Sequence, residues 1–346
     1  VFSVLFAFAA QIVKNKITSK IMMLMVVLIL SLTAGFRDST VGIDTEAYIR
    51  IIQSTSPFYS GELYYKYVDI GFQILVKLLL QLLSDPHYVL FCVSLITNAL
   101  IISTIWQLKD KISFSISIFI YITFFYFETF NILRQWLAIA IIFFAFRYLI
   151  RSKYVFFTTF VLIASTIHLS AIIAMVFIPI HVLVEKKSNI KIKIIGILIT
   201  LAMTIAFIIF GYEILIGKYI HYLSNIGFYN GNLGLLFLVR LALLVFAVFL
   251  YLKRDFTFND IVFQKLIISI SVFGLFISVF SYMYLYAGRI APYATSFQIL
   301  LYSMMNKTKS LSLIIKFIII PLGLYLFYTG LVHSTHGQMP YKVFFE

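Results

Sequence analysis

The sequence has few of the features on which soluble enzymes depend. Only 12% of its 346 residues are charged, and 13 acidic residues stand against 27 basic ones. Its single cysteine, Cys92, lies in an apolar run, which excludes disulfides and cysteine metal clusters. There is no Gly-rich phosphate loop, no HExxH motif and no low-complexity linker. We therefore expect no soluble appendage, no metal site and no cofactor.

Apolar residues are abundant instead, at 62% of the chain. No water-soluble domain can hide that much apolar surface. Apolar runs recur along the whole length at about the 20 residues that a spanning helix needs. We predict an all-α polytopic integral membrane protein with about 11–12 transmembrane helices, residues 1–346 forming a single domain. The first run is expected to be a retained helix rather than a signal peptide.

The net charge of +14 would suggest nucleic acid as the partner of a soluble protein, but here the positive charge follows the loops. Under the positive-inside rule these loops are cytoplasmic, and nucleic acid is excluded as a partner. The basic clusters are Lys14, Lys16 and Lys20; Lys109 and Lys111; Arg147, Arg151 and Lys153; Lys186, Lys187, Lys191 and Lys193; Lys253 and Arg254; and Lys307 and Lys309.

The same rule predicts which segments lie outside. The run 68–84 is interrupted by Gln73, Lys77 and Gln81, so we expect an interfacial or re-entrant helix that does not cross. The outer segments are then a loop over 37–85 with this one embedded helix, a loop over 212–232 and a C-terminal tail over 332–346. Full helices are predicted over 190–211, 233–252, 261–287, 290–305 and 311–331.

The run 154–184 lies between two basic loops and must cross an even number of times. Two helices of about 14 residues each would reach only some 20 Å, short of the roughly 30 Å apolar core of a bilayer. We infer a short, re-entrant-like hairpin whose turn is near His168. A turn at membrane depth is tolerated only inside protein or beside a wet cavity, which would place His168 at the floor of an outward-facing pocket.

The densest polar motif follows the second apolar run, at residues 37–48. Arg37 can present a planar fork to phosphate oxygens, and Asp44 and Thr45 can bind sugar hydroxyls or cap a helix that begins near Tyr48. In the alternative interpretation Arg37 only anchors the chain at the interface and Asp44 is only an N-cap.

Two further motifs contain candidate site residues. Arg134 and Gln135 open an apolar helix, so its dipole and the guanidinium together make an anion site; the alternative is an interfacial anchor. His168 precedes Ser170 at the predicted turn; the alternative is a packed core histidine bonded to a carbonyl.

Two other arginines lie in or beside apolar runs. Arg240 falls well inside the helix 233–252, and Arg289 follows Tyr282, Tyr284 and Tyr286. An arginine at membrane depth is a functional-site hypothesis, although snorkelling would also explain Arg289. Tyrosines on the outer side can stack on sugar rings.

Together these motifs resemble the EpsG family, which is grouped with the Wzy-type polymerases of bacterial surface polysaccharides. The resemblance rests on Arg-x4-Gly-x-Asp-Thr-x2-Tyr at 37–48, Asp-x-Gly-Phe at 69–72, Leu-Arg-Gln at 133–135, His-x-Ser-Ala at 168–171 and Pro-Tyr-Lys at 340–342. Asp69 stands where a Glu is more usual.

The resemblance implies a multi-pass glycosyltransferase of the bacterial cytoplasmic (inner) membrane whose active site faces the periplasm or exterior. Its donor and acceptor would be undecaprenyl-diphosphate-linked oligosaccharide repeat units, extended into O-antigen, capsule or exopolysaccharide. Further partners would be the lipid bilayer and a chain-length regulator.

We expect metal-independent transfer, with arginines holding the diphosphate and His168 or Asp44 as the base. The candidate catalytic residues are His168, Asp44, Arg134 and Arg37. The candidate substrate-binding residues are Asp38, Thr45, Tyr48, Asp69, Gln135, Ser170, Arg240, Arg289, Tyr293 and Tyr341.

Two other function classes compete with this one. A lipid-linked oligosaccharide flippase or transporter would show two halves with corresponding broken helices, which the sequence lacks. A membrane sugar O-acyltransferase would use His168 as base but needs an acyl-donor site on the cytoplasmic side, where the chain offers only lysine clusters.

Overall fold

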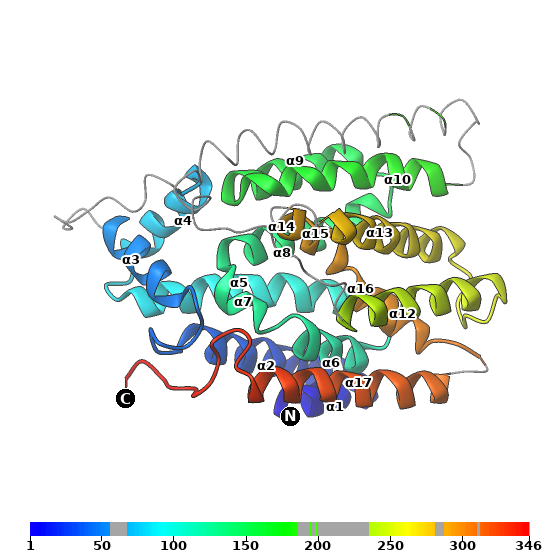
Figure 1. The fold of residues 1–346 in the computed structure, drawn as a ribbon, viewed down its shortest axis with the longest axis horizontal. Helices are drawn as coiled ribbons and strands as arrows, with labels where there is room; N and C mark the ends of the chain where they lie inside the picture. Colours follow the sequence, from blue (N-terminus) through cyan, green and yellow to red (C-terminus); the bar gives the residue numbers. More distant parts are fainter. Residues whose placement is uncertain are drawn as a thin grey trace.

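The computed structural model is a bundle of helices that run along one common direction (Figure 1). It describes residues 1–55, 68–185, 235–280, 287–309 and 312–345. Within this part of the chain every regular element is helical, and the only β contacts are two isolated bridges. Among the described residues, three helices are long and apolar enough to span a membrane, and several shorter helices are also apolar. The predicted all-α polytopic membrane fold is confirmed.

In the N-terminal half of the chain the helices are built around α8, whose sequence between Trp136 and Phe146 is apolar on every side. A helix of that kind must be buried, and most α8 side chains are. At Gly35, where α2 meets α5, a Cβ atom would collide with the backbone of Phe91, so only glycine permits this approach. The helices of this half are α1 (Phe2–Ile12), α2 (Lys16–Gly35), α5 (Pro86–Gln107), α6 (Phe114–Phe124), α7 (Glu128–Asn131) and α8 (Leu133–Leu149).

The other half differs from the prediction in one place. The expected helix over 290–305 is broken into short pieces, because Pro292 has no N–H to donate and cannot continue the preceding turn. The break turns Tyr293 toward the centre of the bundle, where it is 1% exposed. The helices of this half are α12 (Leu235–Leu252), α13 (Ile261–Phe280), α14 (Ala287–Ile290), α15 (Pro292–Thr295), α16 (Gln298–Met305) and α17 (Ser312–Val332).

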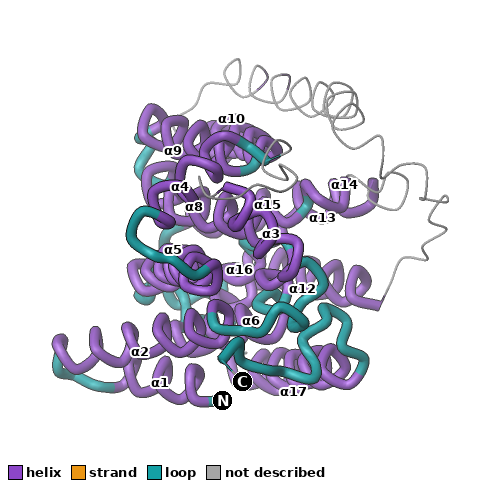
Figure 2. The backbone as a smooth tube through the Cα atoms, turned by 90° about the vertical axis from the view of Figure 1, so that its left-hand side faces the viewer, coloured by secondary structure: helices purple, strands orange, loops and turns teal. Residues whose placement is uncertain are grey.

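The run 154–184 turns back on itself at His168. Helix α9 (Tyr154–Ile167) ends there in an extended residue, and η2 (Leu169–Val176) and α10 (Phe177–Val184) return along it. The hydroxyl of Tyr154 lies 3.0 Å from Nδ1 of His181, so the two arms meet again at their far ends. Viewed along the bundle, α9 and α10 lie at one edge and α1, α2 and α17 at the other (Figure 2). The depth of this turn in a membrane stays a prediction.

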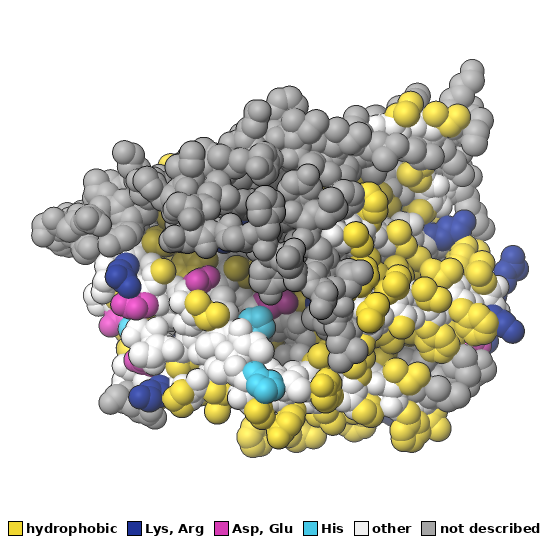
Figure 3. Space-filling model, in the orientation of Figure 1, with side chains coloured by type: hydrophobic (Ala, Val, Ile, Leu, Met, Phe, Trp, Pro, Cys, Tyr) yellow, Lys and Arg dark blue, Asp and Glu magenta, His cyan; other side chains and the backbone are white. Residues whose placement is uncertain are grey.

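The loops are sorted to the two ends of the bundle. At one end the predicted cytoplasmic loops meet, with Lys111 paired to Asp260 and Phe256 bridged to Thr308. At the other end lie α3 (Thr45–Thr55), α4 (Ile70–Leu80), α7 and the C-terminal tail. Figure 3 shows Lys and Arg side chains at both ends of this face, whereas most of the acidic and histidine side chains lie toward the second end. We call the second end the polar end.

The loop predicted over 37–85 contains two helices, α3 and α4. Helix α4 lies in the run 68–84, where the embedded helix is expected, and α3 corresponds to the helix expected to begin near Tyr48. The buried face of α3 includes Tyr48 and Ile52. The predicted helix 190–211 and outer loop 212–232 lie outside the described residues.

Arg37 follows the end of α2 and is fully buried. Its described hydrogen bonds all go to acceptor atoms of the protein. Its Nε donates to Oγ1 of Thr45 (2.9 Å), its Nη2 to the carbonyl of Phe130 (2.9 Å) and its Nη1 to the carbonyl of Ala34. Burial lowers the pKa of Arg37 to about 10, so the guanidinium stays charged at neutral pH. It thereby holds the ends of α2 and α7 and the start of α3 together.

The C-terminal tail completes this polar end. The N–H of Asp38 donates to the carbonyl of Lys342 (2.9 Å). The side chain of Asn131 accepts from the N–H of Ile43 (2.7 Å) and donates to the carbonyl of His336 (3.1 Å). Three segments far apart in sequence are thus tied into one surface.

The sorted loops predict a labelling pattern. In a Cys92→Ser background, single cysteines at the exposed positions Thr40 and Ser84 are expected to react with an impermeant maleimide from one side of the membrane. A cysteine at Ser152 is expected to react only from the other side, because it lies at the opposite end of the bundle. Reaction of Ser84→Cys and Ser152→Cys from the same side would contradict this arrangement.

The contacts of Arg37 predict a stability defect. Arg37→Lys keeps the charge but cannot reach three acceptors in three directions, so it should lower the free energy of unfolding by about 3 kcal/mol. The melting temperature of purified protein in detergent measures this, with the exposed Arg50→Lys as the matched control. Normal melting combined with lost turnover would instead favour the phosphate role predicted from the sequence.

Candidate functional site

Arg134 and Asp69 form an ion pair at the polar end of α8. Nη1 of Arg134 lies 3.4 Å from Oδ2 of Asp69, and the two side chains are only 14% and 15% exposed. Asp69 reaches this position because α4, which begins directly after it, packs on α9 at Gly71, where a Cβ would collide with Thr166. The carboxylate therefore fixes the direction of the arginine fork.

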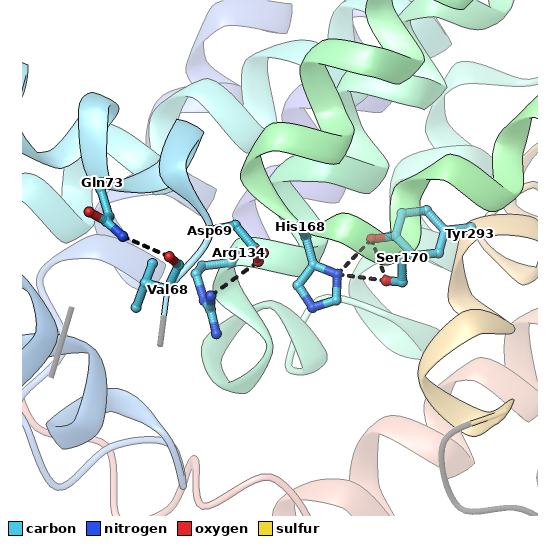
Figure 4. A network of polar contacts seen from close by, with 7 residues as sticks. All are labelled: Val68, Asp69, Gln73, Arg134, His168, Ser170 and Tyr293. Atoms are coloured by element: carbon cyan, nitrogen blue, oxygen red, sulfur yellow. Dashed lines mark hydrogen bonds and ion pairs between the residues drawn. The ribbon is translucent and has the colours of Figure 1, made fainter. Parts of the chain in front are cut away.

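His168 lies beside this pair (Figure 4). Its Nδ1 is 2.6 Å from Oγ of Ser170 and 3.1 Å from the hydroxyl of Tyr293. Ser170 also donates to the hydroxyl of Tyr293 at 3.2 Å. Two hydroxyls on one edge of the ring fix its orientation, and the ring and the guanidinium of Arg134 extend to the same side. The hairpin turn and the break at Pro292 bring these groups together.

Asp44, directly before α3, Tyr48 in α3 and Arg289 in α14 complete the site. Burial raises the pKa of Asp44, against the lowering effect of the positive charges of Arg289 and Arg134. Burial also raises the pKa of Tyr48, again opposed by Arg134. Gln135 is 2% exposed and donates to the carbonyl of Arg289, which ties α14 to α8.

These residues form one group, which we call the His168 cluster. It unites nine of the residues predicted from the sequence: Asp44, Tyr48, Asp69, Arg134, Gln135, His168, Ser170, Arg289 and Tyr293. The ion pair of Arg134 and Asp69 lies beside the histidine, and Asp44 and Arg289 interact electrostatically in the same group, an arrangement suited to holding an anionic group beside a proton acceptor.

Four predicted residues lie instead where the tail meets the 37–45 loop: Arg37, Asp38, Thr45 and Tyr341. Asp38 accepts from the hydroxyl of Thr40 (2.7 Å), which lowers its pKa, and Tyr341 donates to the carbonyl of Thr33 (2.7 Å). The hydrogen bonds described for these four residues go to other protein groups, and they hold the 37–45 loop and the tail together at the polar end.

Arg240 lies in a different place, with a partner that the sequence analysis did not select. Its guanidinium is 5.6 Å from the ring centre of Phe125, and its charge acts on the carboxyl of Glu128. Glu128 is the only acidic residue in an aromatic stretch, Phe-Phe-Tyr-Phe-Glu-Thr-Phe. This isolated position is the sequence feature from which it could have been selected as a candidate.

Comparison with known proteins gives one match. No curated protein and no solved structure matches the chain. The sequence model of the EpsG family matches residues 20–343, which is nearly the whole chain and includes every residue of the His168 cluster. The chain belongs to the EpsG family.

Proposed function

We propose that this protein joins lipid-linked oligosaccharide repeat units by metal-independent glycosyl transfer. Membership of the EpsG family gives it a general role in polysaccharide polymerisation. The proposal goes further in naming undecaprenyl-diphosphate-linked units as donor and acceptor, and the periplasmic or outer face of the cytoplasmic membrane as the place of reaction. The observation that supports it is the His168 cluster, where Arg134 lies beside a histidine and interacts with Asp69 and Asp44 at the polar end of a membrane bundle.

The chemistry requires a leaving group and a base. An acceptor hydroxyl oxygen attacks the anomeric carbon of the donor, the bond from that carbon to the diphosphate oxygen breaks, and the lipid diphosphate leaves with the electron pair. Arg134 and Arg289 would neutralise the charge that grows on the diphosphate, as arginine clamps do for phosphoryl groups. With arginines in this role, no metal ion is required on the leaving group.

The proton of the acceptor hydroxyl must go to a base. When Nδ1–H of His168 donates to Ser170, and Ser170 donates to Tyr293, the other ring nitrogen is left as an acceptor. His168 would then take the proton at Nε2, while Asp44 binds a sugar hydroxyl. The reverse assignment, with Asp44 as base, is supported by its raised pKa.

A flippase or transporter fits this arrangement less well. Alternating access needs polar groups reachable from both faces, whereas the predicted site residues in the described part of the chain gather toward one end of the bundle.

The clamp predicts a geometric requirement at Arg134. Arg134→Lys keeps the charge but loses the planar fork that matches two phosphate oxygens, so turnover per folded molecule should fall at least tenfold. Lipid-linked glycans extracted from a complemented deletion strain measure this as accumulation of single repeat units. Arg50→Lys, on the exposed face of α3, is the control. Full-length polymer from Arg134→Lys would remove the clamp from the mechanism.

The base predicts a kinetic defect without a folding defect. General base catalysis contributes about 10² to 10⁴ in rate, so His168→Ala should give stable, inserted protein that leaves repeat units unpolymerised. A core histidine would instead lower protein level and activity together. Turnover per folded molecule separates the two, with the exposed His333→Ala as control. Near-normal specific activity in His168→Ala would leave Asp44 as the base, testable with Asp44→Asn.

A further inference from the structure

A pocket beside Glu128, which we call the Glu128 pocket, lies at the same end of the bundle as the His168 cluster. It is a cavity of about 300 Å³ between the ends of α6 and α17, helix α7 and the C-terminal tail. The residues that line it include Glu128, His336, Phe127 and three threonines, Thr123, Thr329 and Thr335. Figure 3 shows acidic and histidine side chains close together on this face.

The pocket is separate from the His168 cluster because α8 stands between them. Arg134 and Trp136 are two residues apart on that helix, so they point in directions about 200° apart. Arg134 meets Asp69, whereas Trp136 packs on Tyr121 and Phe125 on the Glu128 side.

The carboxyl of Glu128 interacts electrostatically with a charged neighbour, Arg240. Burial raises the pKa of the carboxyl to about 7, while the charge of Arg240 and the indole of Trp136 act in the opposite direction. Within the part of the chain that the structure describes, Nε of Arg240 is buried without a hydrogen-bond partner. The pocket therefore has a carboxyl group that can accept hydrogen bonds and a nearby positive charge that keeps its ionised form accessible. His336, whose pKa is lowered by burial, is the titratable group on the tail side.

These groups match the chemistry of an uncharged sugar. Carboxylates and threonine hydroxyls bind sugar hydroxyls, aromatic rings cover the apolar face of a pyranose, and the volume lies at the lower limit of ligand pockets. A diphosphate suits the pocket poorly, because Glu128 offsets the charge of Arg240. We infer that this cavity is a saccharide-binding site for the growing or incoming glycan, with Glu128 as its main hydrogen-bond acceptor. The inference rests on the proposed function.

A direct binding experiment tests the inference without using catalysis. In Cys92→Ser protein in nanodiscs, a cysteine at the exposed rim position Thr335 is alkylated by a maleimide. The probe is the saccharide released by mild acid from the lipid-linked units that a deletion strain accumulates. It should slow the reaction at Thr335→Cys but leave a matched cysteine at Ser84 unaffected. When Glu128→Gln is added, the saccharide concentration that gives half-maximal protection of Thr335→Cys should rise at least tenfold.

Each outcome decides a separate question. The saccharide site would be overturned if the saccharide did not slow alkylation of Thr335→Cys. It would also be overturned if the saccharide slowed alkylation equally with and without Glu128→Gln. Absence of lipid-linked units in the deletion strain would overturn the proposed function instead. A melting temperature of Glu128→Gln equal to that of the parent shows that the fold is kept. If it falls, Thr329→Val provides a second variant, expected to weaken protection several-fold.

Discussion

The polar end depends on how the positive charge of Arg37 is satisfied. A buried charge is tolerated only when its donors are bonded, and the three described acceptors belong to α2, α3 and the chain at Phe130 in α7. Satisfying one guanidinium therefore fixes three chain segments relative to each other. Two of them lead directly to functional candidates, since α3 presents Tyr48 beside Arg134 and α7 presents Glu128 to the Glu128 pocket.

The fold class could be predicted from the sequence because a fold class of this kind depends on composition and periodicity alone. Apolar runs with basic loops indicate spanning helices and their sides without any tertiary contact. The membership of the His168 cluster was also largely predictable: Arg134, His168 and Asp44 are polar groups beside long apolar runs, where each needs a specific reason to be kept. The structure adds their distances and partners.

The errors and omissions have identifiable causes. An arginine at the end of an apolar run looks the same whether its fork faces a ligand or backbone carbonyls, so the bonding of Arg37 could not be read from its position. The helix break at Pro292 was hidden by apolar residues on both sides. Glu128 was missed because its charged neighbour, Arg240, lies on a helix far along the chain and only the fold brings them together.

Helix α8 stands between the His168 cluster and the Glu128 pocket. Its body is buried and apolar, while its first turn directs Arg134 to one side and Trp136 to the other. The proposed function requires that two glycans be held at once, one by its diphosphate and the other by its sugars. In that proposal the arginine fork on one face of α8 would hold the diphosphate, and the Glu128 pocket on the other face would hold sugars. Because the His168 cluster and the Glu128 pocket lie toward the same end of the bundle, the proposed function would bring its two substrates from one side of the membrane.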